Sequence, residues 1–383
     1  MISFGEEDHG SHMHLVKTYQ GWNMSKLLDV TNLCHRLVYG EVQIEDALDE
    51  LAAIRKRGGY GKIAYFLCFP VMSLGFAITG FGGRWIDALI AGLFGCIVGG
   101  AGLAAERFPS FAYLCDFISA LLVSFLARLV EWKLDGKCYC FSFITTTLSG
   151  LVMLFPGLSL TISIIEISTR NMISGTVRLF TALFTALLVG FGMSFGSIFA
   201  KMVLYKTTDV PASMLTPTTI PAGCESSGWC KSVHYGWYVP FFFPLAASVC
   251  IFFESRHRQW PIMFVASGVG LAVCTYLYLI PDLAATPQIP NVVAALLIGI
   301  ISNAYARYTG DVAVGPILAG IINIVPGSMG VRSSLGFFEN NVVNGTQFAF
   351  QMLTIGLSIT MGLFMATLLV FPTSGPRLEH MTV

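Results

Sequence analysis

GLVMLFPGLSLTISIIEISTRNMISGTVRLFTALFTALLVGFG, residues 150–192, joins two apolar runs through a Pro156-Gly157 break and a short segment with Glu166 and Arg170. The same layout returns at a constant offset of 170 residues, from Pro156 to Pro326. The other identities at that offset include Gly150 and Gly320, Gly157 and Gly327, Ser163 and Ser333, Asn171 and Asn341, Gly175 and Gly345, Phe180 and Phe350, and Gly192 and Gly362. Shared apolar composition does not explain so many identities without a gap, so we infer an internal duplication.

The composition is typical of a membrane protein. Of the 383 residues, 55% are hydrophobic and 11% are charged, whereas soluble domains carry about 25% charged residues. The net charge is zero, which gives no argument for a nucleic-acid partner. The sequence has no GxxxxGK phosphate loop, and Cys138 and Cys140 lack a second pair at zinc-ligand spacing. We expect a polytopic membrane protein in a lipid bilayer, with no metal or other cofactor.

Ten apolar stretches are long enough to span a membrane, since about 20 residues cross a hydrocarbon core of ~30 Å. We place them near residues 62–80, 86–105, 110–130, 138–156, 175–204, 237–254, 259–279, 289–307, 312–327 and 345–371. The duplication relates the first five to the second five. Because five is odd, the two copies enter the membrane with opposite orientation. The predicted fold is therefore all-α, with two inverted five-helix repeats that contain Pro-Gly-broken helices.

The chain divides into five parts by composition. The predicted boundaries are an N-terminal cytosolic segment 1–61, a first repeat 62–205, a linker 206–236, a second repeat 237–372 and a tail 373–383. Residues 1–20 suggest a disordered start, and a helical pattern begins at Ser25. The distribution of Lys and Arg favours both termini in the cytoplasm. The linker then lies outside the cytoplasm, where Cys224 and Cys230 could form a disulfide bond.

The two Pro-Gly breaks are the predicted centre of function. Pro156 and Pro326 each remove a backbone donor late in a spanning helix, and Gly157 and Gly327 loosen the chain further. Unpaired backbone is tolerated in a bilayer where protein or a water-filled cavity satisfies it. Breaks at equivalent positions of inverted copies indicate a central substrate site. The alternative is a proline that simply ends each helix at the membrane interface.

Charges inside apolar runs are the next candidates. Ser159, Ser163, Glu166 and Arg170 share one helical face, and Glu166 and Arg170 have the spacing of an i, i+4 ion pair. The alternative is an exposed interfacial pair. Asp116 lies in the third predicted span, where a carboxylate is costly and normally faces the bundle interior. It is a candidate partner for a proton or a substrate ammonium group, unless the span begins later and Asp116 is interfacial.

Several uncharged polar residues could also line the path. Thr146 precedes the first break, Asn323 precedes the second, and Asn171 and Asn341 occupy equivalent positions after the breaks. A single polar residue of this kind more often serves in hydrogen bonding between helices. Gly192-Met-Ser194-Phe-Gly196 matches the GxSxG pattern of a nucleophile elbow but lies within a predicted span, so we reject it. We find no clustered catalytic set and expect no enzyme.

Residues 155–180, FPGLSLTISIIEISTRNMISGTVRLF, with a second VPG and NGT in the other copy, resemble the threonine/serine exporter family. The closer resemblance is to its fungal, pheromone-regulated membrane protein-like branch. Residues 34–62, CHRLVYGEVQIEDALDELAAIRKRGGYGK, resemble the end of that branch's cytosolic domain, and WYVPFFFPL at 237–245 resembles the start of its second half. The family carries a longer cytosolic region, so we expect the N-terminal part of that domain to be missing.

The resemblance implies export of small hydroxy amino acids, driven by an ion gradient, with H+ as the expected coupling ion. We therefore predict a secondary-active carrier for threonine, serine or a similar small amino acid, which works by alternating access. Asp116, Glu166 and the two breaks would form or gate its path. The alternative, from a different class of protein, is a non-transporting membrane scaffold used in mating or cell fusion.

Overall fold

The computed structural model describes residues 2–6, 9–14, 21–134, 141–205, 233–284, 286–338 and 342–372. Strands β1 (Ile2–Glu6) and β2 (His9–His14) form an antiparallel hairpin, where the sequence suggested a disordered start. Every later element in the described residues is a helix. Cys224, Cys230 and Asn341, most of the linker and the tail from residue 373 lie outside the described residues.

The first half of the helical region begins with three long helices and a one-turn helix, followed by the segment around the first break. Its elements are α3 (Lys62–Thr79), α4 (Trp85–Arg107), α5 (Pro109–Ala112), α6 (Cys115–Leu134), α7 (Phe143–Gly150), the 3₁₀ turn η1 (Val152–Leu154), α8 (Gly157–Ser168) and α9 (Met172–Tyr205). α7 and the segment Val152–Ser168, which comprises η1 and α8, meet at an angle of 58° at Leu151, ahead of the Pro156-Gly157 break. Pro156 is the N-cap residue of α8, so the proline and glycine separate η1 from a new short helix.

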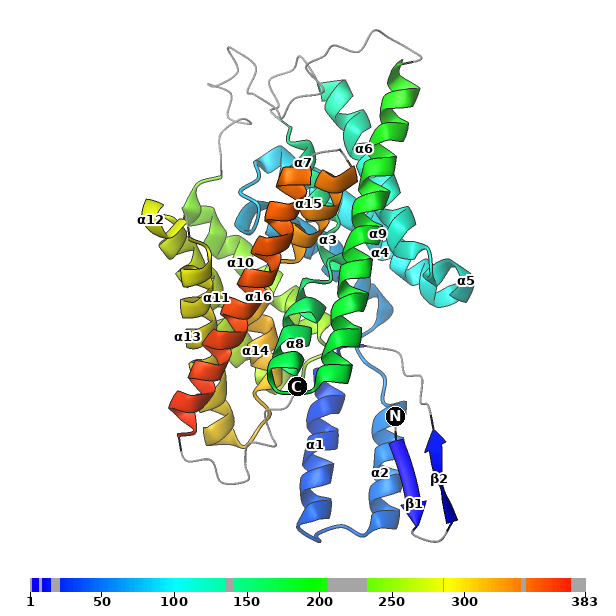
Figure 1. The fold of residues 1–383 in the computed structure, drawn as a ribbon, viewed down its shortest axis with the longest axis vertical. Coiled ribbons are helices and arrows are strands. Elements are labelled where there is room, and N and C mark those ends of the chain that lie inside the picture. Colours follow the sequence, from blue (N-terminus) through cyan, green and yellow to red (C-terminus); the bar gives the residue numbers. More distant parts are fainter. Residues whose placement is uncertain are drawn as a thin grey trace.

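The second half repeats that order of long and short helices. Its elements are the 3₁₀ turn η3 (Tyr235–Trp237), α10 (Tyr238–Phe252), the 3₁₀ turn η4 (His257–Gln259), α11 (Trp260–Tyr278), α12 (Pro281–Ala284), α13 (Gln288–Thr309), α14 (Val314–Ile321), α15 (Gly327–Phe338) and α16 (Val342–Val370). Helices α8 and α15 begin at the equivalent glycines Gly157 and Gly327. In Figure 1, α9 runs upward and α16 runs downward along the long axis of the molecule.

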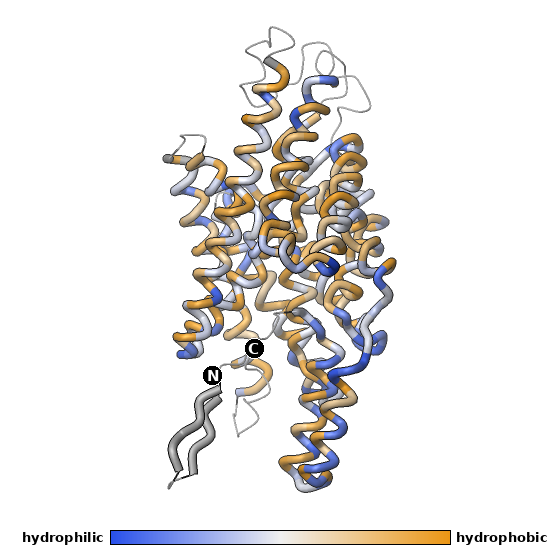
Figure 2. The backbone as a smooth tube through the Cα atoms, turned by 90° about the vertical axis from the view of Figure 1, so that its right-hand side faces the viewer, coloured by the Kyte–Doolittle hydropathy of each residue, from blue (hydrophilic) through white to orange (hydrophobic). Residues whose placement is uncertain are grey.

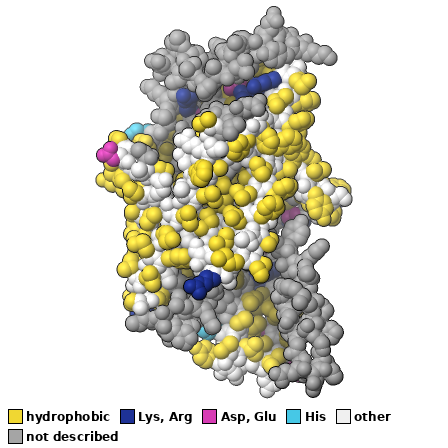
Figure 3. All heavy atoms as spheres, in the orientation of Figure 1, with side chains coloured by type: hydrophobic (Ala, Val, Ile, Leu, Met, Phe, Trp, Pro, Cys, Tyr) yellow, Lys and Arg dark blue, Asp and Glu magenta, His cyan; other side chains and the backbone are white. Residues whose placement is uncertain are grey.

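Seven helices in the described residues are long and apolar enough to cross a membrane, or eight if the bent pair α7–α8 counts as one span. Ten spans were expected from the sequence. The difference has two physical causes. α6 carries Asp116, Arg128, Glu131 and Lys133, and the expected spans 138–156 and 312–327 are short helices on either side of a break. Hydrophobic side chains dominate the face shown in Figure 3, as expected for helices in contact with lipid.

Equivalent glycines have the same packing role in both halves. A Cβ built on Gly192 would lie 2.8 Å from Phe117 O, so α9 packs directly on the backbone of α6. A Cβ on the equivalent Gly362 would lie 2.6 Å from Val292 O, so α16 packs in the same way on α13. Small residues let helices approach closely in a bilayer, where dispersion contacts and hydrogen bonds drive association. Glycines separated by 170 residues therefore make similar helix contacts in the two halves.

Two further helices form a hairpin at one end of the bundle (Figure 2), α1 (Met24–Val38) and α2 (Ile44–Lys56). α2 carries acidic residues in its first turn and basic residues in its last, which complement the helix dipole. Leu33, Ala47 and Ile54 form the small core between the two helices. Met24 N donates to Phe253 O at 2.9 Å, which fixes the start of α1 to the end of α10.

Candidate functional site

The two Pro-Gly breaks meet in the interior of the molecule. A Cβ built on Gly157 would lie 2.5 Å from Gly327 Cα, which is closer than real Cβ atoms approach other atoms. A Cβ on Gly327 would lie 3.0 Å from Phe155 Cβ. Neither position has room for a side chain without a shift of backbone. From this contact, which we call the crossing, α8 extends toward the lower end of Figure 1 and α15 toward the upper end.

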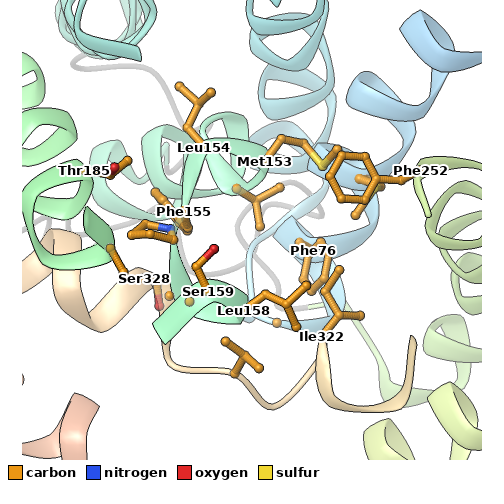
Figure 4. Close-up of a pocket in the computed structure, with 18 of the residues that line it drawn as sticks. Phe76, Met153, Leu154, Phe155, Leu158, Ser159, Thr185, Phe252, Ile322 and Ser328 are labelled. Carbon is orange, nitrogen blue, oxygen red and sulfur yellow. The ribbon is translucent and has the colours of Figure 1, made fainter. Parts of the chain in front are cut away.

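A cavity of about 500 Å³ adjoins the crossing (Figure 4). Its apolar wall is formed mainly by large side chains near the first break and at the ends of α3 and α10, including Phe76, Met153, Phe155, Leu158 and Phe252. Its polar lining comes from α6, α8, α9 and the second break: Asp116, Ser159, Arg178, Thr181, Thr185, Asn323 and Ser328. Cavities with an apolar wall and a few convergent polar groups are typical of small-molecule sites.

A second cavity, of about 640 Å³, shares part of its wall with the first. The shared residues are Trp22, Asp116, Met153, Leu154 and Phe252. The remainder of its lining includes charged residues at helix ends, among them Lys62, Glu106 and Glu254. Lys62 Nζ and Glu106 Oε2 form an exposed ion pair at 3.0 Å. The second cavity therefore connects a charged rim close to the α1–α2 hairpin with the wall of the first cavity.

Asp116 lines both cavities. It lies in the first turn of α6, which begins at Cys115, later than the residue 110 expected from the sequence. A helix N-terminus stabilises a negative charge, and this location matches the later start that the sequence left open. Its carboxylate has no hydrogen-bond or ion-pair partner among the described residues, so it is free to bind a proton or a cation that enters the cavity.

Glu166 forms an ion pair, but its partner differs from the predicted one. Glu166 Oε1 lies 3.1 Å from Arg178 Nη2, and Ser174 Oγ donates to Glu166 Oε2 at 2.9 Å. The predicted pair with Arg170 is wrong. Arg170 adopts φ 68° at the turn between α8 and α9 and is exposed. The turn folds α9 back along α8, and this brings Arg178 to the buried carboxylate.

Arg178 is the charged residue of the cavity lining that the sequence analysis missed, and Thr181, Thr185 and Ser328 were missed as well. Arg178 extends from α9 into the lining of the first cavity, and its Nε atom is buried without a hydrogen-bond partner. The sequence does show Arg178 as a cation within the apolar run after the first break, and this could have identified it as a candidate site residue. Because its ion pair joins residues on two helices, the pair could not be recognised from i, i+4 spacing. Membrane-buried cations are costly and usually face the bundle interior or a cavity.

The other predicted residues have different locations. Ser159 and Asn323 line the cavity, and Asn323 Nδ2 donates to Ser267 Oγ at 2.9 Å while its Oδ1 is buried without a partner. Ser163 is buried and donates to Leu160 O within its own helix at 2.6 Å. Asn171 is exposed after the turn that contains Arg170. Ser163 and Asn171 therefore do not line the cavity.

Thr146 belongs to a separate buried cluster around Asp87, a residue that the sequence analysis did not single out. Thr146 Oγ1 donates to Asp87 Oδ1 at 3.1 Å, and Ser142 N donates to the same oxygen at 2.9 Å. Arg84 N donates to Asp87 Oδ2 at 3.1 Å and completes a cap at the start of α4. An acidic residue at the third position of a helix is a recognisable capping signal. The cluster joins the starts of α4 and α7.

Arg332 is a chemical difference between equivalent positions of the two halves. It lies on α15 with its guanidinium carbon 5.9 Å from the centre of the Phe81 ring, and its Nε is buried without a partner. The equivalent residue of the first copy is Ile162, a fully buried side chain of the apolar core. Phe81 also lines the first cavity. Among the described residues, Arg332 has no salt-bridge partner. The Phe81 ring that it contacts forms part of the wall of the first cavity.

The fold and site define a multi-helix membrane protein in which two broken segments meet beside a polar-lined cavity. Two models of protein families match the chain. The family model described as "Putative threonine/serine exporter" matches residues 1–200, and "Threonine/Serine exporter, ThrE" matches residues 239–369. The chain belongs to the threonine/serine exporter family. It is the family that the sequence resemblance indicated.

The chain is also similar to curated fungal proteins named pheromone-regulated membrane protein 10. The relative from Candida albicans is 26% identical and aligns with 98% of this chain and 34% of its own length. The relative from Eremothecium gossypii is 26% identical, with 98% of this chain and 51% of the relative covered. The chain thus spans about a third to a half of these relatives. No solved structure matches.

Proposed function

We propose that the chain is a secondary-active transporter for threonine, serine or similar small amino acids, and that its substrate path runs through the cavity beside the crossing. The observation that carries the proposal is the contact between Gly157 and Gly327. In secondary transporters, substrate sites lie where broken helices of two repeats meet near the bilayer midplane. The family to which the chain belongs supports the substrate class.

The proposal treats the two halves as an inverted repeat with ten membrane passes. In this arrangement α7–η1–α8 is one broken pass and α14–α15 is its counterpart. The opposite directions of α9 and α16 in Figure 1 and the equivalent glycine contacts of α6–α9 and α13–α16 support this reading. Alternating access then consists of rocking one half against the other, with the crossing close to the point about which they move.

The chemistry of the cavity suits a small polar solute. Its volume of about 500 Å³ lies in the range of roughly 300–1,000 Å³ that is usual for small-molecule sites. Ser159, Thr181 and Thr185 supply hydroxyl groups that can hydrogen-bond a hydroxylated side chain. The second cavity would be the cytosolic vestibule, with both termini in the cytoplasm. The conformation described here is then open toward the cytosol, as an exporter requires when it loads substrate.

Asp116 would couple transport to H+ movement. Asp116 has no partner among the described residues and lines both cavities. A proton bound to its carboxylate is therefore accessible from the vestibule and from the substrate site. Ionisable residues that face a cavity within a helix bundle are typical members of ion and proton pathways. The alternative scaffold function is favoured by one observation, the name of the fungal relatives, which describes pheromone regulation and no transport.

The test uses the purified chain in proteoliposomes loaded with labelled L-threonine or L-serine. We expect counterflow of both amino acids and concentrative movement when a pH gradient is imposed. Asp116→Asn should retain counterflow and lose the response to the pH gradient, because the amide cannot carry a proton. Asp282→Asn, which alters an exposed aspartate in α12, is the matched control and should respond as the unmodified chain.

Three results would count against this account. Absence of amino-acid counterflow in the unmodified chain contradicts the transport function and favours the scaffold. Counterflow that stays coupled to pH in Asp116→Asn contradicts the role of Asp116 alone. Equal loss in Asp116→Asn and Asp282→Asn shows that a general change in charge, and not the cavity carboxylate, is responsible.

A further inference from the structure

Arg178 has unused hydrogen-bonding capacity beside the first cavity. A guanidinium group carries five N–H donors. Glu166 Oε1 lies 3.1 Å from Nη2, whereas Nε is buried without a hydrogen-bond partner. The side chain is 22% exposed, and the residue belongs to the cavity lining. Leaving a buried charged donor unpaired is costly, so the arrangement favours an additional acceptor.

We propose that Arg178 binds the carboxylate group of the transported solute, and that Glu166 positions the guanidinium for this contact. This inference rests on the proposed transport function and adds to it the recognition of a zwitterionic α-amino acid. Guanidinium groups bind carboxylates through two parallel N–H donors, which gives geometric specificity as well as strength.

The residues around Arg178 present one continuous face of α9 to the cavity. Thr181, Ala182 and Thr185 follow at helical spacing, and all three line the cavity with Arg178. Thr181 Oγ1 donates to Val177 O at 2.8 Å and Thr185 Oγ1 donates to Thr181 O at 3.0 Å, so their oxygens remain available as acceptors. The small side chain of Ala182 leaves room between them. Carboxylate recognition and hydroxyl contacts can thus come from a single helix.

Charge balance favours a zwitterion over other solutes. Glu166 and Arg178 together carry no net charge, and the exposed fraction of the Glu166 side chain is 6%. An α-amino acid brings both a carboxylate and an ammonium group and keeps the site neutral. An amino-acid amide lacks the carboxylate that the unpaired guanidinium donor would bind, and it would leave that donor without an acceptor. Asp116, in the same cavity lining, is an available acceptor for the ammonium group.

The first experiment compares two ligands on the unmodified chain in detergent. We expect L-threonine to bind and L-threonine amide, which keeps the hydroxyl and ammonium groups, to bind at least tenfold more weakly. Hydrogen bonds to charged groups contribute about 1.5–3 kcal/mol, which corresponds to roughly tenfold to a hundredfold in Kd. Equal affinity for both ligands overturns the carboxylate assignment while leaving amino-acid transport intact. Absence of binding to either ligand overturns the proposed function itself.

The second experiment changes the protein. Arg178→Gln should weaken L-threonine binding roughly tenfold to a hundredfold and abolish the preference for threonine over its amide. Arg178→Lys, which keeps the charge but lacks the fork, should retain part of that preference. Glu166→Gln should weaken L-threonine binding less than Arg178→Gln and keep the preference. Arg170→Gln, in the neighbouring turn, is the control and should bind both ligands as the unmodified chain. A preference that persists in folded Arg178→Gln overturns the proposal.

Discussion

At the residue scale, Arg170 marks the turn that makes the ion pair of Glu166 and Arg178 possible. Its φ of 68° places a non-glycine residue in the left-handed region, which costs about 1 kcal/mol for an L-amino acid. Glycine is the usual residue at this position after a helix. The strained residue therefore lies where the chain reverses direction between α8 and α9. After this turn, α9 brings Arg178 next to the Glu166 carboxylate of α8.

Arg170→Gly should stabilise the chain by about 0.5–1 kcal/mol, because glycine adopts the left-handed conformation without strain. Thermal unfolding of the detergent-purified protein measures the effect as a rise in Tm of about 1–2 °C. Arg170→Ala is the control, since it removes the same charge and keeps the strain. Equal Tm values for the glycine and alanine variants would show that strain at this turn is negligible.

Individual residues were predictable where the signal was local. Asp116 and Ser159 stood out as polar groups in apolar runs, and both line the cavity. The partner of Glu166 was not predictable, because helical spacing proposes a residue on the same helix and the actual partner lies across a turn. Thr146 was chosen for its location before a break, but its hydroxyl is used by Asp87.

At the element scale, the two Pro-Gly breaks determine how the short helices are placed. The prolines end regular hydrogen bonding, and the glycines permit the backbones of the two breaks to touch. The sequence indicated the breaks and their equivalence, since both appear as PG at one offset. It did not reveal that the breaks contact each other, because this depends on how two distant halves pack. It also did not reveal that α7 and α14 are short, because apolar residues continue past their ends.

Gly157→Ala should destabilise the chain by about 1–3 kcal/mol, because its Cβ would overlap the backbone of Gly327 and the crossing cannot expand freely. We expect a lower Tm and a large loss of threonine flux in proteoliposomes. Gly100→Ala in α4 is the matched control, since a Cβ there meets no atom within 4 Å. A Gly157→Ala variant with unchanged Tm and flux would mean that the contact between the breaks is not required.

At the scale of the whole molecule, a largely helical membrane fold was predictable from composition and the apolar runs, whereas the hairpin of β1 and β2 was not. The family was predictable as well, since the residues around the first break carry the resemblance. The number of membrane passes was harder to predict from the sequence. α6 carries several charges, and the broken segments are too short to cross a membrane as single apolar helices. The cavity itself arises from packing between distant helices and has no signature in any single stretch.

The overall arrangement gives each part a role in one proposed path. The α1–α2 hairpin is fixed to the end of α10, and the second cavity lies next to that junction. The first cavity follows, bounded by the crossing of the two breaks. On this account a solute passes from the charged rim, along Asp116, to the face of α9 that carries Arg178.

The most direct test of the central claim is to fill the cavity and measure flux. Ser159 points into the cavity in Figure 4, whereas Ser168 is an exposed residue at the end of the same helix. We predict that Ser159→Trp abolishes L-threonine counterflow in proteoliposomes while Ser168→Trp, with an equal increase in side-chain volume, transports as the unmodified chain. Normal counterflow by folded Ser159→Trp would contradict a substrate path through this cavity.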